Sequence, residues 1–133
     1  MSKSIIVRLK EDHSKILVRA CEELNRIARL IGSSDERRDP NEIMRSLDDI
    51  EKDISDHFRY EEKEIFPLVK DADREIINEL LQDHKLIIER IKVLKFVLRD
   101  SKKIKENIME IEERIKGHTK REELIISSTL EKG

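Results

Sequence analysis

The chain has 133 residues, of which 44% are charged and 3% are aromatic, and its formal net charge is −2. The length fits a single domain spanning residues 1–133, and the scarcity of Gly, Pro and aromatic residues argues against a strand-rich fold. A nearly balanced charge excludes the basic footprint of nucleic-acid-binding proteins. The single Cys excludes an internal disulfide framework, and no apolar run reaches the roughly 20 residues of a membrane span. The N-terminal apolar patch is too short for a signal peptide, so a cytoplasmic protein is expected.

Apolar residues recur at steps of three and four along four segments, which is typical of amphipathic helices. These segments are residues 9–31, 43–68, 77–98 and 104–129. Gly32 suits a C-terminal cap for the first helix, and Asp39 followed by Pro40 suits the N-cap and first position of the second. Pro67 should kink or end that helix nearby, and the third helix should start near residues 71–73. Short connections then predict an all-α fold, an up-down-up-down antiparallel four-helix bundle.

Each predicted inward stripe is apolar except near one level. The predicted stripes include Ile16 in the first helix, Leu68 in the second, and Ile125 and Thr129 in the fourth. A histidine interrupts every stripe once, at His13, His57, His84 and His118. Two glutamates continue the stripes of the second and fourth helices, each four residues after a histidine: Glu61 and Glu122. All six ionisable side chains are therefore predicted to point into the bundle.

The depth of these residues along the bundle gives an independent test. Residues equally far from a shared loop lie at the same level of an antiparallel bundle, since each residue advances a helix by about 1.5 Å. Counted from the predicted loops, the four imidazoles fall in one layer to within about one turn, and the two glutamates lie one turn further along. A faint repeat supports this layer, because "DHSKI" matches "DHKLI" and "HFRYEE" matches "HTKREE".

This constellation favours a metal site. A buried carboxylate without a partner is costly and usually neutralises or acquires a cation. For one His and Glu pair alone, a satisfied core histidine beside a surface glutamate is the better interpretation, but six such residues at one level argue against it. Imidazole and carboxylate ligands suit iron, and also zinc, manganese or copper, whereas the lack of thiolates excludes an iron–sulfur cluster. Two carboxylates from facing helices can bridge two metals and leave positions open for a small ligand.

The motifs "DHSKI", "HFRYEEKEIFP" and "HTKREE" resemble the three ligand-bearing motifs of the hemerythrin-like, or HHE cation-binding, domains, and "DHKLI" supplies the remaining helix. The resemblance implies a four-helix bundle around a non-haem di-iron centre, with zinc or manganese as substitutes for iron. The implied ligands are His13, His57, His84 and His118, with Glu61 and Glu122 as bridges. Two departures stand out: Ile88 replaces the second histidine that oxygen-carrying hemerythrins have on the third helix, and Glu122 follows its histidine by four residues instead of five. The ligand set is most similar to that of di-iron proteins that repair iron centres.

The expected function is binding of, or reaction with, a small ligand such as O2, NO or peroxide, in oxidative or nitrosative stress or in iron-centre repair. The alternative is an iron- or oxygen-responsive sensor or interaction module without catalysis, and whether the chain is an enzyme stays open. A protein partner or a homo-oligomer is also considered, because the apolar arm "SIIV" could cover a bundle end or a neighbour.

Residues beside the layer receive the simpler interpretation. Carboxylates next to the ligands are expected to be solvated or in surface salt bridges, with orientation of an imidazole as the alternative for the two aspartates: Asp12, Asp83, Glu62 and Glu123. Tyr60 is expected to flank the helices, and Cys21 to be a small buried hydrophobe. The three phenylalanines are expected in the core or at its rim: Phe58, Phe66 and Phe96.

Overall fold

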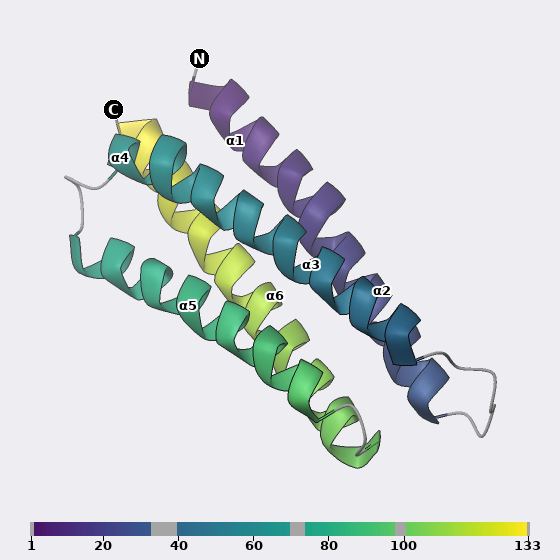
Figure 1. The fold of residues 1–133 in the computed structure, drawn as a ribbon. Helices are drawn as coiled ribbons and strands as arrows, with labels where there is room; N and C mark the ends of the chain where they lie inside the picture. The colour runs from purple at the N-terminus through teal and green to yellow at the C-terminus, as the bar shows by residue number, and fades with distance from the viewer. Residues whose placement is uncertain (1, 33–39, 70–73, 98–100, 133) are drawn as a thin grey trace.

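The computed structural model describes residues 2–32, 40–69, 74–97 and 101–132, and these residues form helices without a strand among them. They build four rods (Figure 1). The first rod is α1 (Ser2–Asp12), η1 (His13–Val18) and α2 (Arg19–Gly32). The second is α3 (Pro40–Tyr60), η2 (Glu61–Ile65) and α4 (Phe66–Val69). The third is α5 (Arg74–Phe96), and the fourth is α6 (Ser101–Lys132).

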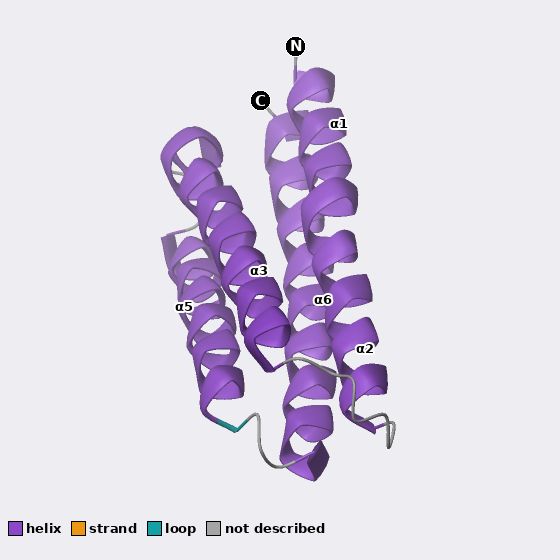
Figure 2. Ribbon diagram, turned by 45° about the vertical axis from the view of Figure 1, so that its right-hand side comes forward, coloured by secondary structure: helices purple, strands orange, loops and turns teal. Residues whose placement is uncertain are grey.

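Successive rods run in opposite directions, so both chain termini lie at the same end of the bundle (Figures 1 and 2). This is the predicted up-down-up-down four-helix bundle, and its all-α class is confirmed. None of the described helices combines the length and the apolarity that crossing a bilayer would need.

Two apolar clusters fill the bundle, one above the other. The larger cluster takes leucines and isoleucines from all four rods and includes Phe58. The smaller cluster lies towards the chain termini and contains Leu9, Ile65, Phe66, Val69, Ile77, Leu80 and Ile126. Along every rod the predicted polar level separates the two clusters: His13, for example, lies between Leu9 and the first member of the larger cluster, Leu17. Burial of these faces supplies the main driving force for the fold.

Two π-helical segments change the predicted inward stripes. A π turn closes through an i→i+5 hydrogen bond and so contains one residue more than an α turn. In η2, for example, the amide of Phe66 donates to the carbonyl oxygen of Glu61. At each of the two π segments one buried position differs from the predicted position by one residue. Leu17 is buried instead of the predicted Ile16, which is half-buried after η1 begins. Leu68 is 54% exposed, and Val69 takes its predicted place beyond η2.

Three further expectations need correction. Near the end of α6, Ile126 is buried in place of the predicted Ile125, because the inward positions after His118 follow at four-residue steps. Thr129, also predicted to point inward, is half-buried. Phe96 is 89% exposed, because it lies two residues after the inward Leu94 and thus about 200° around the helix.

The helix ends agree in part with the sequence. The first helix begins at Ser2, well before residue 9, so the apolar arm belongs to α1, and Ile5 and Ile6 pack against the smaller cluster. The second rod begins at Pro40 as predicted and ends at Val69, two residues after Pro67. The predicted cap Asp39 and the predicted helix start at residues 71–73 lie outside the described residues.

Gly117 offers a test of the packing around α6. It lies inside a 32-residue helix, and a Cβ atom added there would meet nothing within 4 Å. The substitution Gly117→Ala should therefore raise the free energy of unfolding by about 0.5–1 kcal/mol, since Ala loses less backbone entropy in a helix. Urea denaturation of the metal-free protein measures this change. A lower free energy of unfolding in the variant would contradict the open environment described for this residue.

Candidate metal centre

The six ionisable residues predicted to point inward meet in one layer between the two apolar clusters. All are buried, with at most 3% of each residue exposed: His13, His57, Glu61, His84, His118 and Glu122. Every rod contributes to the layer. The first residue of η1 is a histidine of the layer and the first residue of η2 is one of its glutamates, so each π segment begins at this level. We call these six residues the polar layer.

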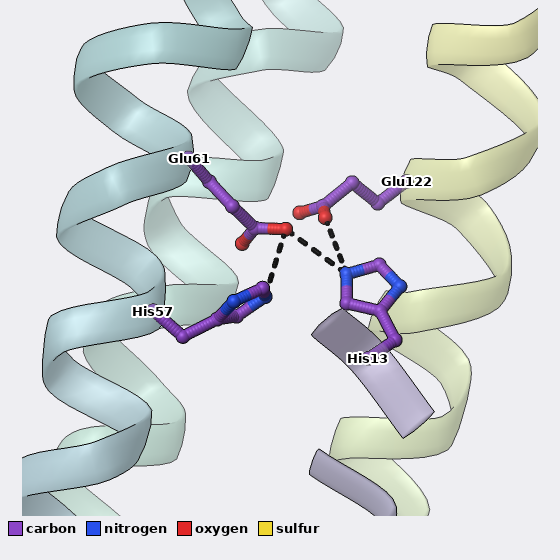
Figure 3. A group of neighbouring side chains, drawn as sticks. All are labelled: His13, His57, Glu61 and Glu122. Atoms are coloured by element: carbon purple, nitrogen blue, oxygen red, sulfur yellow. Dashed lines mark hydrogen bonds and ion pairs between the residues drawn. The ribbon is translucent and has the colours of Figure 1, made fainter. Parts of the chain in front are cut away.

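Glu61 lies between imidazoles from three rods. Its Oε2 atom is 3.0 Å from Nε2 of His13 and 3.1 Å from Nε2 of His57 (Figure 3). Its Oε1 atom is 3.2 Å from Nε2 of His84. The two oxygens of one carboxylate therefore face different histidines.

Glu122 repeats this arrangement from the opposite side. Its Oε1 atom is 3.0 Å from Nε2 of His13 (Figure 3). Its Oε2 atom is 2.8 Å from Nε2 of His118 and 3.5 Å from Nε2 of His84. We call His13 and His57 one imidazole pair, and His84 and His118 the other. In each carboxylate one oxygen lies near the first pair and the other oxygen lies near the second pair, contacting one or both imidazoles of that pair.

The candidate ligand atoms form two groups that share both glutamates. The first group is His13, His57, Glu61 and Glu122. The second group is Glu61, His84, His118 and Glu122. Within each group the four atoms lie within 4.8 Å of one another. Such a spacing allows a single ion to contact all four atoms of a group.

Several atoms of the layer are close together without being hydrogen-bonded. Within the polar layer, five buried nitrogen and oxygen atoms have no hydrogen-bond partner among the described residues: His57 Nε2, Glu61 Oε1, His84 Nε2, His118 Nε2 and Glu122 Oε2. The distances between them are short, but the groups are not aligned as donor and acceptor. A buried polar atom that lacks a partner costs about 1–3 kcal/mol. The donor set therefore fits metal ions, which would satisfy these atoms together.

A second set of carboxylates surrounds three of the imidazoles. Nδ1 of His13 donates to Glu123 over 2.7 Å, and Nδ1 of His84 donates to Glu62 over 2.8 Å. Nδ1 of His118 donates to Asp83 over 3.1 Å. A carboxylate only accepts, so each bond keeps a proton on Nδ1 and directs the other nitrogen of the ring, Nε2, into the layer. We call Glu62, Asp83 and Glu123 the outer carboxylates.

Glu62 and Glu123 keep 42% and 24% of their side chains exposed, but their hydrogen bonds to His84 and His13 were not expected. The surface salt bridge favoured for Asp83 is present, with Arg121, and the alternative of orienting an imidazole also applies. Asp83 orients His118 of α6, not His84, which follows it in sequence, and it also accepts from the guanidinium of Arg121. The two pairs of adjacent glutamates, in "HFRYEE" and "HTKREE", are the sequence feature that could have predicted these hydrogen bonds. Neighbouring residues point about 100° apart on a helix, so when the first glutamate faces the core the second can face the adjacent rod. Asp12 has no hydrogen bond to an imidazole in the described chain.

Aromatic rings enclose the layer on both sides. Phe58 stacks on His84 with ring centroids 3.8 Å apart, and Phe66 lies 5.4 Å from His84 on its other side. Phe58 also meets the edge of His118 at 5.7 Å. These contacts confirm Phe58 and Phe66 as core residues. They also limit rotation of the two imidazoles and help to exclude water.

The remaining candidates lie apart from the layer. Tyr60 is half-buried beside the smaller cluster, and the guanidinium of Arg8 lies 5.5 Å from its ring centroid. Cys21 is buried in the larger cluster, and burial raises the pKa of its thiol to about 11. Its role as a small buried hydrophobe is confirmed, because such a thiol is not ionised near neutral pH.

The charges of the layer balance through protons when no metal is bound. Burial alone would lower the pKa of His13, but hydrogen bonds with Glu122, Glu61 and Glu123 outweigh it and raise the pKa to about 10. Burial is likewise outweighed at His84, where Glu122 and Glu61 raise the pKa to about 9. Burial would raise the pKa of Glu122, yet the neighbouring Glu61 and the imidazoles around it hold the pKa well below 4.5.

Comparison with known proteins agrees with this site. The family model of the hemerythrin HHE cation binding domain matches residues 4–130, which is almost the whole chain. No curated protein and no solved structure matches the sequence. The family match and the buried cluster of histidines and glutamates together indicate that the chain binds a metal ion.

The stability of the metal-free protein should depend on pH through the polar layer. The raised pKa values of His13 and His84 stabilise the fold fully below 6.5, and this contribution is lost as the pH rises through about 9 and 10. The lowered pKa of Glu122 stabilises the fold above 4.5 and ceases to do so as the pH falls. The free energy of unfolding should therefore be greatest between pH 4.5 and 6.5 and decline on both sides.

Denaturant titrations of the metal-free chain from pH 4 to pH 10 measure this profile, at roughly one-unit steps. The metal-loaded chain is the control, because bound cations replace the protons and should remove the decline above pH 6.5. A metal-free chain that becomes more stable between pH 7 and pH 10 would contradict the charge balance described for the layer.

Proposed function

Because the chain belongs to the hemerythrin HHE cation-binding domain family, we propose that it is a non-haem di-iron protein that binds or reacts with O2, NO or peroxide. The cellular role that fits this chemistry is a response to oxidative or nitrosative stress, including repair of iron centres. One observation carries the proposal: both glutamates direct one oxygen to each pair of imidazoles, so that two groups of four buried atoms share two carboxylates.

The proposed ligands divide into two equivalent sets. His13 and His57 would hold one ion and His84 and His118 the other, and Glu61 and Glu122 would contribute to both. Four protein atoms for each ion would leave positions for a small ligand. When bound, a pair of ferrous ions supplies the electrons and the open positions with which such a ligand reacts. Zinc and manganese accept the same donors and are expected to bind as substitutes.

The protein contributes orientation and exclusion of water. The outer carboxylates hold three imidazoles with Nε2 directed into the layer, and the apolar clusters above and below keep solvent away. Ile88 takes the place of the second histidine on the third helix of oxygen-carrying hemerythrins, and it is half-buried beside the groove that borders His84. A site without that fifth imidazole favours reaction with the ligand over reversible oxygen carriage.

Metal stoichiometry tests the proposal directly. Metal-free protein loaded anaerobically with ferrous iron should take up two ions per chain, and its absorption spectrum should change on addition of O2 or NO. Glu122→Gln should lower the uptake, because the neutral amide bridges two cations poorly. Glu106→Gln, at an exposed position of the same helix, is the matched control and should retain two ions. Uptake of fewer than two ions by the unsubstituted chain, or no spectral response to either gas, would refute the proposal.

A sensor or interaction module is the second candidate. It is favoured by the fact that the candidate ligands come from all four rods of the bundle. The polar layer draws on all four rods, so metal binding would tie η1 of the first rod to the other three. A ligand present at one hundred times its dissociation constant stabilises a fold by about 2.7 kcal/mol. Loss of metal would then loosen the first rod and expose a surface that a partner can recognise.

Thermal unfolding with and without metal tests this candidate. Loading with ferrous iron should raise the melting temperature by roughly 5–10 °C, as expected for about 2.7 kcal/mol in a domain of this size. Hydrogen exchange should slow most in α1 and η1. Equal melting temperatures for the metal-free and loaded protein would argue against a sensor, even if two ions bind.

A further inference from the structure

We infer that the two ion positions differ in metal affinity, and that the ion between His84 and His118 is held more tightly than the ion between His13 and His57. The inference rests on the proposed di-iron function and adds an order of binding and release to it. It follows from an asymmetry in the polar contacts that surround otherwise equivalent ligand sets.

The outer carboxylates support the two imidazole pairs unequally. Both members of the pair His84 and His118 donate Nδ1 to a carboxylate, Glu62 and Asp83 respectively. In the other pair only His13 has such a partner, Glu123. His57 makes no hydrogen bond to an outer carboxylate in the described chain. One position thus has two supported imidazoles and the other has one.

The grooves between the rods show the same difference. The groove bordering His84, of about 340 Å³, contains Glu62, and the groove bordering His118, of about 270 Å³, contains Asp83. In both, a carboxylate on the outside binds the imidazole. A third groove, of about 310 Å³, borders His57 and is lined by three aspartates, none of which binds the ring: Asp12, Asp53 and Asp56. The acidic side chains are present there, but they do not orient the ligand.

Ring packing adds to the asymmetry. His84 is enclosed between Phe58 at 3.8 Å and Phe66 at 5.4 Å, and both rings are nearly parallel to it. His57 has a tilted contact to Phe58 at 6.1 Å and an edge contact to His13 at 5.2 Å. Its ring is therefore less restrained, so ordering it around an ion costs more conformational entropy.

These differences set the expected size of the effect. An outer carboxylate fixes the tautomer of a ligand imidazole and raises its basicity, and its loss typically costs about 10- to 100-fold in metal affinity. The position with one support fewer should bind its ion more weakly by about that factor. The ion beside His57 would accordingly enter last and leave first, next to the groove that opens at that residue.

Stepwise titration of the metal-free chain with Co²⁺ under anaerobic conditions tests the inference, with visible absorption and a competing chelator as readouts. Two ions should bind in two steps whose affinities differ by about 10- to 100-fold. Glu62→Gln and Asp83→Asn should each weaken the first step by about 10- to 100-fold, whereas Glu123→Gln should weaken the second. Glu64→Gln, an exposed neighbour of Glu62 in η2, is the matched control and should change neither step.

The outcomes separate this inference from the function on which it rests. Binding of two ions with equal affinity, or equal weakening of both steps by Glu62→Gln and by Glu123→Gln, would overturn the inference and leave the di-iron proposal intact. Uptake of fewer than two ions by the unsubstituted chain would overturn both. Far-UV circular dichroism of each metal-free variant establishes that the helices are retained, and Asp83→Asn provides a second test of the first step if Glu62→Gln does not fold.

Discussion

The protein depends on how six ionisable groups are kept apart from water. Two carboxylates and four imidazoles lie in the bundle interior, between apolar clusters whose buried residues are at most 8% exposed. Isolated charges in such surroundings are too costly to persist. They are tolerated because each carboxylate faces three imidazoles at 2.8–3.5 Å, and because protons or cations balance the negative charge. The fold and the chemistry of this chain are therefore coupled: the same contacts stabilise the interior and bring the candidate metal ligands together.

The layered arrangement explains why so regular a bundle can hold so polar a site. The apolar clusters on either side supply the burial that a domain of this size needs, and they come from all four rods. The polar layer can then be optimised for ligand geometry instead of packing. The outer carboxylates extend the network to the surface, where Arg121 pairs with Asp83. Each imidazole with such a partner has a defined tautomer, which an ion would otherwise have to select on binding.

Much of this was predictable from the sequence, because the periodicity of helices is strict. The stripe of isoleucines and leucines predicted four helices, and counting residues from the loops was enough to predict that the histidines share one level. The choice between Ile16 and Leu17, or between Leu68 and Val69, was not predictable in this way. It depends on two π turns, whose extra residue leaves no mark in a pattern of threes and fours.

The hydrogen bonds of Glu62 and Glu123 to imidazoles were missed for a different reason. A glutamate next to an inward glutamate looks solvated when one helix is considered alone, and only the adjacent rod reveals its partner, as for Glu62 and His84. Phe96 shows the opposite error, since its chemistry suggests the core while its position on α5 faces solvent. Spacing along one helix predicts direction well, but contacts between rods depend on the rotation of each helix about its own axis.

The two π segments have a consequence for how the chain tolerates change in length. Loss of a single residue within residues 14–18 or 62–65 would let the segment revert to ordinary α-helix with no break in its hydrogen bonding. Because a π turn completes about the same rotation as an α turn with one residue more, the two parts of the rod would keep nearly the same relative orientation. A deletion elsewhere in the rod would instead turn one part by about 100° relative to the other, and the rod would then no longer direct both its apolar residues and its polar-layer residues to the interior. The short π stretches are therefore the places where a rod can lose one residue and still keep its interior face.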